Sequence, residues 1–142
     1  MWDLTSRLCV ALVDETGASG CIVSRVIGDV LVQVAEHAVD GRTFQLGRGF
    51  LVSQFPATAG VLESGIARAV SVDDEDPDVA EVGVLETLAM TSVLMLAMGA
   101  QESAWGLVEV YRDSGAFAAD DIERATRVVA AASSRLVEHV GA

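Results

Sequence analysis

Glu109 is the clearest candidate in this sequence for a side chain that carries chemistry from within an apolar segment. It lies in the β-rich run 105–112, with a valine on either side. A carboxylate in such a run can anchor the polar part of a small ligand inside an apolar pocket. It can also form an ion pair at the surface of a sheet, which contributes little to stability. Arg25, in an earlier β-rich run, is the candidate cation for either arrangement.

The other charged and metal-ligating residues have ordinary structural interpretations. The acidic run 73–78, with Glu81 beyond it, offers several oxygens to a hard cation but lacks the ligand spacing and central glycine of a calcium loop. A solvated turn that caps the next helix is the favoured interpretation. His37 and His139 have no partner at ligand spacing on their own predicted elements, so no metal site is expected. The Gly-Arg-Gly run 47–49 is a lone GxG, which supports phosphate binding only weakly.

No residues are assigned a catalytic role. Cys9 and Cys21 show no CxxC or histidine-rich spacing and are expected to be small buried side chains. A cysteine-dependent redox enzyme remains a third class of function beside the two given below. No Ser-His-Asp or paired-carboxylate arrangement stands out, so the chain is not expected to be an enzyme.

Length and composition predict a single domain over residues 1–142. The sequence is 51% hydrophobic, and no apolar run approaches the ~18 residues that span a bilayer. The N-terminus lacks the basic leader of a signal peptide, so a cytoplasmic location is expected. The net charge of −12 comes from 21 acidic residues against 9 arginines, with no lysine. Because that charge repels phosphate groups, neither nucleic-acid nor membrane binding is expected.

Hydrophobic periodicity predicts helices and strands in an order typical of an α+β sandwich. The predicted helices are 2–16, 56–63, 78–90 and 119–139, and the predicted strands are 20–27, 30–38, a short edge strand at 43–46, 67–72, 92–98 and 104–112. In the third helix the apolar period is assigned to Val82, Leu85, Glu86 and Ala89. In the last helix the apolar stripe is Ile122, Ala125, Val129, Ala132 and Leu136. Tight turns between paired strands predict an antiparallel sheet.

Several motifs, in this order, resemble those of GAF domains, which are small regulatory modules. They are the strand pair 21–26 and 31–35, the loop glycine Gly49, the helix end and strand over 61–65 and 69–73, the strand glycine Gly106, and Phe117 with Asp121 at the start of the last helix. The sequence departs from the family pattern at Ser53, where a second loop glycine is expected. It also lacks the proline-containing turn that usually follows the strand ending near 97–100.

The resemblance implies a central antiparallel sheet of five to six strands. The N- and C-terminal helices would cover one face, and short helices and loops the other. The cyclic-nucleotide motif of some GAF domains cannot occur, because the chain contains neither Asn nor Lys. The chromophore-attaching loop cysteine of bilin-binding members has no counterpart, because Cys9 falls on a predicted helix and Cys21 on a predicted strand. The cofactor is therefore unknown.

The resemblance also implies where a ligand would bind. Strand alternation places Glu109 and Tyr111 on one face of their strand, which should line the family's ligand cavity, while the opposite, all-apolar face should receive the terminal helices. The first and last of the central strands are neighbours in GAF domains, so Arg25 and Glu109 could meet across them. Met95 would suit a plastic pocket through its adaptable side chain. The residues expected to bind the ligand are Arg25, Phe55, Met95, Glu109 and Tyr111.

The predicted function is a sensory GAF-type domain that binds an unidentified small molecule. It would signal through its terminal helices, as a homodimer, to a tethered output domain such as a kinase, cyclase, phosphodiesterase or transcription activator. The alternative is a ligand-free dimerisation or scaffold domain with the same fold and a filled interior.

Overall fold

One antiparallel sheet organises the computed structural model, which describes residues 2–44, 50–100 and 103–140. The strand order is β3-β2-β1-β6-β5-β4. The strands are β1 (Gly20–Ile27), β2 (Val30–Ala38), β3 (Phe50–Leu51), β4 (Arg68–Ser71), β5 (Ser92–Ala100) and β6 (Ser103–Arg112), and the helices are α1 (Trp2–Thr16), α2 (Pro56–Ser64), α3 (Val79–Leu88) and α4 (Ala119–Val140), with a 3-10 turn η1 (Val52–Gln54) before α2. The predicted loop at 47–49 and the side chain of His139 lie outside the described part of the chain.

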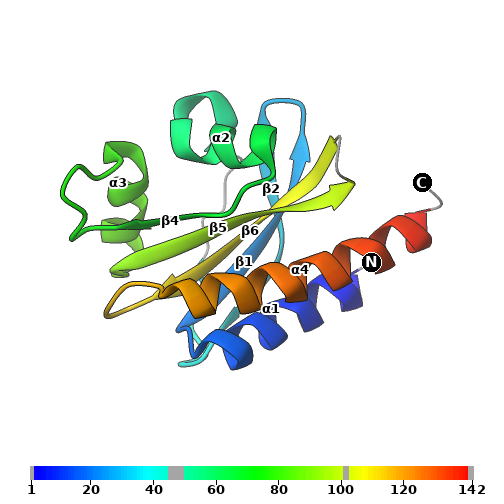
Figure 1. Cartoon of the computed structure of the whole chain (residues 1–142), viewed down its shortest axis with the longest axis horizontal. Helices are drawn as coiled ribbons and strands as arrows, with labels where there is room; N and C mark the ends of the chain where they lie inside the picture. Colours follow the sequence, from blue (N-terminus) through cyan, green and yellow to red (C-terminus); the bar gives the residue numbers. More distant parts are fainter. Residues whose placement is uncertain (1, 45–49, 101–102, 141–142) are drawn as a thin grey trace.

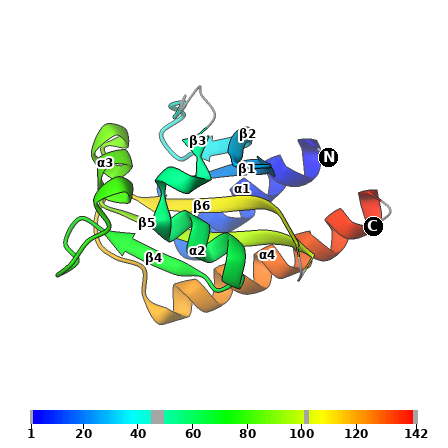
Figure 2. The ribbon, with the colours of Figure 1, turned by 90° about the horizontal axis from the view of Figure 1, so that it is seen from above.

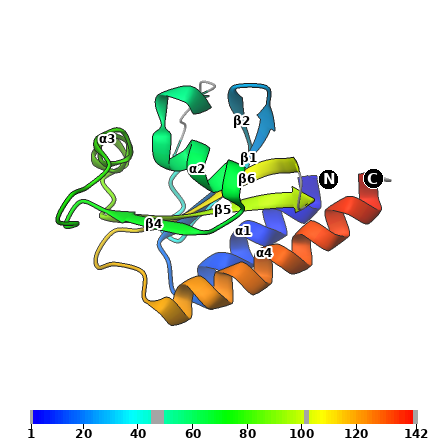
Figure 3. The ribbon, with the colours of Figure 1, turned by 45° about the horizontal axis from the view of Figure 1, so that its top comes forward.

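The two faces of the sheet are covered differently, as predicted. Helices α1 and α4 lie side by side, antiparallel, on one face, and α2 and α3 lie over the other (Figures 1 and 3). Helix α1 begins and α4 ends at the same end of the molecule (Figure 2). Within the described ranges, no helix has both the length and the apolar character needed to cross a bilayer. The predicted α+β class, the sheet of five to six strands, which has six, and the placement of the terminal helices are confirmed.

The helix-covered face buries the predicted apolar stripe of α4. Its residues pack with α1 and with the β6 side chains Val108 and Val110, which alternate away from Glu109. The buried members of the stripe are Ala125, Val129, Ala132 and Leu136, with Ile122 partly buried. Spacings of three and four residues keep these side chains on one side of a helix, so α4 lies flat on the sheet.

The edge strand predicted at 43–46 is wrong for the part that the structure describes. Thr43 and Phe44 are not in a strand, and β3 instead pairs with Val30 and Leu31 of β2. The backbone N–H of Phe44 donates to the Glu36 carboxylate at 2.6 Å, and its ring packs against Tyr111 with centroids 5.7 Å apart. Phe44 therefore packs into the core instead of alternating along an edge.

The buried face of α3 also differs from the prediction. The buried residues are Glu81, Leu85 and Leu88, whereas the predicted period was Val82, Leu85, Glu86 and Ala89. Asp78 caps the helix by accepting the backbone N–H of Glu81 at 3.1 Å, as the acidic-run interpretation anticipated. The buried positions are spaced i, i+4 and i+7, so a carboxylate occupies the first place in an otherwise apolar stripe.

Gly106 allows β1 and β6 to approach closely. A Cβ on this residue would lie 2.4 Å from the carbonyl oxygen of Ser24 on β1, well inside van der Waals contact. The glycine in the closing strand of the motif thus has a steric cause, because a side chain here would prevent the close approach of β1 and β6.

Candidate ligand cavity and its junction with the terminal helices

A small cavity lies between the sheet and the layer formed by α2 and α3. Its lining residues come from seven parts of the fold and are Ser24, Leu31, Gln33, Phe50, Phe55, Thr58, Glu81, Val84 and Glu109. Its volume, measured as room for the centre of a water molecule, is about 30 Å³. Since one water needs roughly 10–15 Å³ by that measure, the cavity accommodates about two waters or one compact group.

Gln33 lies on the cavity side of β2, because the register set by the tight turn at Gly28-Asp29 pairs it with Ser24. Beyond this pair the register shifts, so Val23 pairs with Ala35 and Val34 is the extra residue of a β-bulge. The bulge changes the facing of the β2 side chains beyond Val34, not that of Gln33. The Oε1 atom of Gln33 is buried, and no described residue donates a hydrogen bond to it.

Glu109 projects from β6 into the cavity and is 8% exposed. Its Oε2 accepts a hydrogen bond of 2.9 Å from the Tyr111 hydroxyl. Burial raises the pKa of Glu109 from 4.5 to about 7, and the nearby Glu81 charge acts in the same direction, while the Tyr111 bond opposes them. The carboxyl therefore exchanges its proton near neutral pH. Burial also raises the pKa of Tyr111 well above its ordinary value, which keeps that hydroxyl a donor.

Glu81 projects into the same cavity from α3 and is 2% exposed. Its Oε1 accepts a hydrogen bond of 2.7 Å from the Thr58 hydroxyl on α2. Burial, and then the charge of Asp78, raise the pKa of Glu81, whereas the Thr58 bond and the charge of Arg68 lower it. Two buried carboxylates on different elements thus line the same small cavity.

No positive side chain balances these two carboxylates at the cavity. Its described lining contains no Arg or His, and neither Glu81 nor Glu109 forms an ion pair within the described residues. A buried carboxylate without a cationic partner is costly, and proteins avoid the cost by protonation or by binding a positive group.

An aromatic wall closes one side of the cavity. Phe50 and Phe55 meet edge to face with centroids 5.4 Å apart. The η1 turn between them is fixed to the β1–β2 hairpin, because the backbone N–H and hydroxyl of Ser53 donate to the Asp29 carboxylate at 2.9 and 2.6 Å. Ser53, the residue that departs from the family's glycine pattern, therefore has a structural role of its own.

The structure places four of the five predicted ligand residues at or beside the cavity. Phe55 and Glu109 line it, and Tyr111 contacts it through its bond to Glu109. Met95 is fully buried behind it, with its Sδ 3.5 Å from the Thr58 hydroxyl.

Arg25 does not meet Glu109, so the predicted pair is wrong. Arg25 is opposite Gly106 on β6, whereas Glu109 is opposite Ile22, three residues earlier in β1. An odd separation along a strand puts side chains on opposite faces, so Arg25 projects on the helix-covered side of the sheet. Its exposed guanidinium lies 5.8 Å from the centroid of the Trp105 ring.

Several cavity residues were not predicted from the sequence. Glu81 was assigned to the solvated acidic segment, although its spacing to Leu85 and Leu88 is a signal of the buried face. Ser24 was correctly predicted to face Gln33, but neither residue was assigned to the site. The same turn register that pairs Gln33 with Ser24 also places Gln33 on the face of the sheet that carries Glu109.

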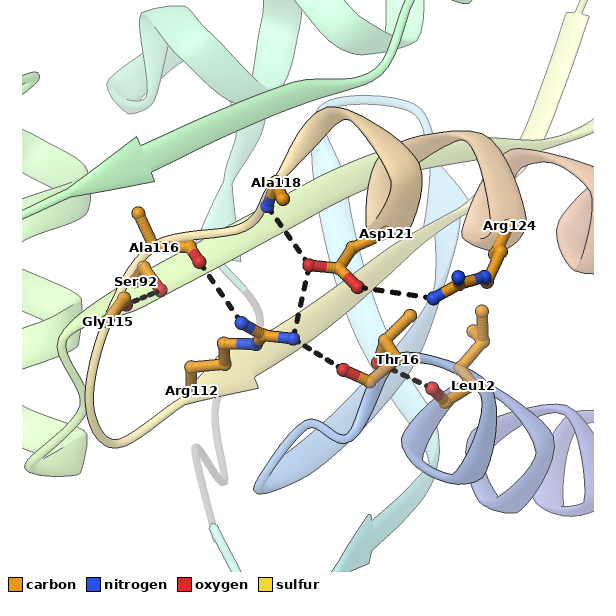
Figure 4. A network of polar contacts seen from close by, with 9 residues as sticks. All are labelled: Leu12, Thr16, Ser92, Arg112, Gly115, Ala116, Ala118, Asp121 and Arg124. Atoms are coloured by element: carbon orange, nitrogen blue, oxygen red, sulfur yellow. Dashed lines mark hydrogen bonds and ion pairs between the residues drawn. The ribbon is translucent and has the colours of Figure 1, made fainter.

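The strand that carries Glu109 and Tyr111 ends in a polar junction with both terminal helices (Figure 4). Arg112 donates through its two terminal nitrogens to the carbonyls of Thr16, the last residue of α1, and of Ala116. It also bonds the Asp121 carboxylate of α4 at 3.2 Å, and its guanidinium stacks over Phe117. Asp121 accepts the backbone N–H of Ala118 at 3.0 Å, which caps α4. The Phe-x-x-x-Asp motif thus fixes the start of α4 against Arg112.

The two cysteines are buried, as predicted. Cys9 on α1 and Cys21 on β1 are free thiols with no exposed surface. Burial, and then the hydrogen bond with Cys9, raise the pKa of Cys21 well above its ordinary value. The thiolate needed for redox or nucleophilic chemistry is therefore disfavoured.

Comparison with known proteins shows the fold. No family model matches the sequence, and no curated protein does. Among solved structures, the PixJ GAF domain of Thermosynechococcus elongatus in its blue-light absorbing form is 15% identical, with a TM-score of 0.77 over 95% of this chain and 83% of that chain. The phycocyanobilin-bound GAF domain of a cyanobacterial phytochrome is 16% identical, with a TM-score of 0.79 over 96% and 83%.

A longer structure matches over part of its length. The chromophore-binding domain of the Stigmatella aurantiaca bacteriophytochrome is 15% identical, with a TM-score of 0.78 over 96% of this chain, and this chain spans about half of it, 54%. At these identities the likeness concerns architecture alone. The chain has a GAF-type fold.

Proposed function

We propose that this chain is a non-catalytic sensory domain whose ligand is a small molecule bound in the cavity beside Glu81 and Glu109. The observation that supports the proposal most directly is the pair of buried carboxylates that face one small cavity from α3 and β6. The similar solved structures include a chromophore-binding domain and a phycocyanobilin-bound GAF domain, which supports a small-molecule ligand for a domain of this fold. The whole span 1–142 would act as one such domain.

The signal would reach the terminal helices through β6. Glu109 and Tyr111 adjoin the cavity, and the next residue, Arg112, bonds the end of α1 and the start of α4. A ligand that changes the Glu109–Tyr111 contact can shift the end of β6, and with it the packing of both helices.

The terminal helices would pass this change to a second copy and to a tethered output domain in the cytoplasm. Helices α1 and α4 form an outer layer, and Val10 of α1 is 42% exposed on it. Because α1 begins and α4 ends at the same end of the molecule, a domain joined to either helix would lie at that end. A kinase, cyclase, phosphodiesterase or transcription activator joined there would respond to a movement of the pair.

Hydrogen exchange with a metabolite screen tests this proposal. A compound that binds the cavity should raise the melting temperature, since binding to the folded state alone stabilises it by RT ln(1 + [L]/Kd). It should also change exchange at the α1 and α4 ends that bond Arg112. Binding that leaves both helix ends unchanged would contradict the signalling route.

The second candidate is a ligand-free scaffold domain. The small volume of the cavity, about 30 Å³, is the observation that favours it. A stable dimer in light scattering, together with no thermal shift across the metabolite screen, would support the scaffold and exclude the sensor.

A further inference from the structure

We infer that the cavity binds a compact organic cation, an ammonium or guanidinium group held between the carboxylates of Glu81 and Glu109. This inference rests on the proposed ligand-binding function and names the chemical class of the ligand. Four observations carry it: the polar atoms that face the cavity, its charge, its apolar wall and its size.

The polar atoms left free at the cavity are acceptors. The Thr58 hydroxyl donates a hydrogen bond to Glu81, and the Tyr111 hydroxyl donates one to Glu109. Within the described residues, no donor reaches the second oxygen of either carboxylate, nor the buried Oε1 of Gln33. A ligand that satisfies these atoms must bring several N–H donors, as ammonium and guanidinium groups do.

The cavity becomes negatively charged when Glu81 and Glu109 ionise, and no cationic side chain is part of its described lining. Glu81 and Glu109 are each more than nine-tenths buried, and no described cation forms an ion pair with either. Arg68 on β4 acts on Glu81 from beyond the lining, and Asp78 adds further negative charge. A bound cation would supply the missing partner in an environment where charges interact strongly.

The apolar part of the lining favours an organic cation over a metal ion. Phe50 and Phe55 form one wall, and Leu31 and Val84 complete it. Calcium takes six to eight oxygen ligands and magnesium keeps several waters, and the four side chains of this wall offer no oxygen ligand. No group of three or more metal-ligating His, Cys, Asp or Glu side chains exists in the described ranges. Aromatic faces also attract organic cations.

The size of the cavity limits the group that enters it. A volume of about 30 Å³ admits about two water-sized groups, which suits the N–H-bearing end of a guanidinium or methylammonium head. A ligand with a longer body would place only its charged head between the carboxylates.

Two probes of nearly equal shape test the inference: methylguanidinium chloride and methylurea, titrated against the whole isotope-labelled chain and followed by amide NMR. Both are planar and similar in size, but only the first is charged. We expect methylguanidinium to shift the amides around Thr58, Glu81 and Glu109 saturably, and methylurea to bind at least ten-fold more weakly. Sodium and magnesium chloride at equal ionic strength should leave these amides unchanged.

Matched variants identify the carboxylates as the cause. Glu81→Gln and Glu109→Gln keep the shape of each side chain and should each weaken methylguanidinium at least ten-fold. Glu86→Gln changes an exposed carboxylate on the same helix, α3, and should not weaken it. Amide spectra of the free variants verify that they fold. Unchanged affinity in both cavity variants would overturn the inference.

The affinity should also depend on pH. The titratable groups beside Glu109 on its own face of the sheet are Glu81 from α3 and Tyr111 from its own strand, while Cys21 of β1 adjoins it from the opposite face. Ionised Glu109 holds the cation, so methylguanidinium should bind several-fold more tightly at pH 8 than at pH 6. An affinity that stays constant over this range would contradict a role for the Glu109 charge.

The outcomes separate this inference from the proposed function. Methylurea that binds as well as methylguanidinium would overturn the cation class and leave a ligand cavity in place. If neither probe binds, the cation class is wrong, and the metabolite screen then decides independently whether the cavity takes another ligand.

Discussion

At the scale of single residues, two carboxylates are buried in the interior, and each accepts a hydrogen bond from one neutral donor. Thr58 serves Glu81, and Tyr111 serves Glu109. Both pKa values are raised, with burial as the first cause. Such groups destabilise the empty folded state when they ionise, and they are common at functional sites.

Glu109→Gln should remove a pH-dependent cost of folding. The pKa of Glu109 is raised by folding, so its contribution to stability is present below 4.5 and is lost as pH rises through about 7. The shift sets an upper limit of about 3 kcal/mol on that loss. Urea unfolding should therefore show the variant equal to the wild type near pH 4.5 and more stable above pH 8. A difference that does not change with pH would contradict the assignment.

Thr58→Val should destabilise the fold by removing the donor to Glu81. A buried acceptor left without its donor costs about 1–3 kcal/mol. Because the Thr58 bond lowers the pKa of Glu81, its loss matters most where Glu81 is ionised, so the effect should be larger at pH 8 than at pH 5. Thr87→Val, which removes an exposed bond to the Gly83 carbonyl on α3, is the control and should change stability by less than about 0.5 kcal/mol. Equal effects of the two variants would show that the Glu81 contact is unimportant.

The sequence was sufficient for Glu109 but not for its partners. Strand alternation correctly placed Glu109 and Tyr111 on the face away from the terminal helices, because the period of two is a local property. Pairing Glu109 with Arg25 required the register between β1 and β6, which depends on the whole sheet. Glu81 was missed because it follows an acidic run, and its burial depends on Thr58 in another helix.

At the scale of elements, local signals were sufficient wherever apolar periodicity was strong. The predicted spans of α1, β1 and β2 agree with the structure, and those of α4 differ only at its last residue. The prediction of the edge strand was wrong because the observed edge strand, β3, consists of only Phe50 and Leu51, which are too few residues to show alternation. The register of the β1–β2 hairpin near its Gly28-Asp29 turn was predicted, whereas the bulge at Val34 was not.

Arg112→Lys should loosen both terminal helices at their junction with β6. Lysine keeps the charge but cannot reproduce the fork that reaches Thr16, Ala116 and Asp121 together. We expect a loss of about 1–3 kcal/mol and faster hydrogen exchange in the last turn of α1 and the first turn of α4.

Arg124→Lys is the control for this variant. Arg124 contacts the same Asp121 carboxylate at 3.8 Å but is half exposed, so its replacement should change stability by less than about 0.5 kcal/mol. If Arg112→Lys left stability and exchange unchanged, charge alone would hold the junction; if Arg124→Lys loosened the helix ends as much, the loss could not be assigned to the fork of Arg112.

At the scale of the whole molecule, the proposed dimer would form through the α1–α4 layer. Val10→Arg should place a charge in that interface and shift the chain toward monomer in light scattering. Val79→Arg, at a residue 85% exposed on α3, should leave the dimer unchanged. A wild-type chain that is monomeric at tens of micromolar, or an equal effect of both variants, would contradict a dimer through this layer.

The central claim is that Glu109 and Glu81 form a buried acidic site for a cationic ligand. Carbon-detected NMR titration of the Glu109 side-chain carboxyl measures its state directly, first in the free chain and then with saturating methylguanidinium. We expect a pKa of about 7 in the free chain and a value lowered toward 4.5 once the cation is bound. A pKa near 4.5 in the free chain, or one that does not move on saturation, would contradict the central claim.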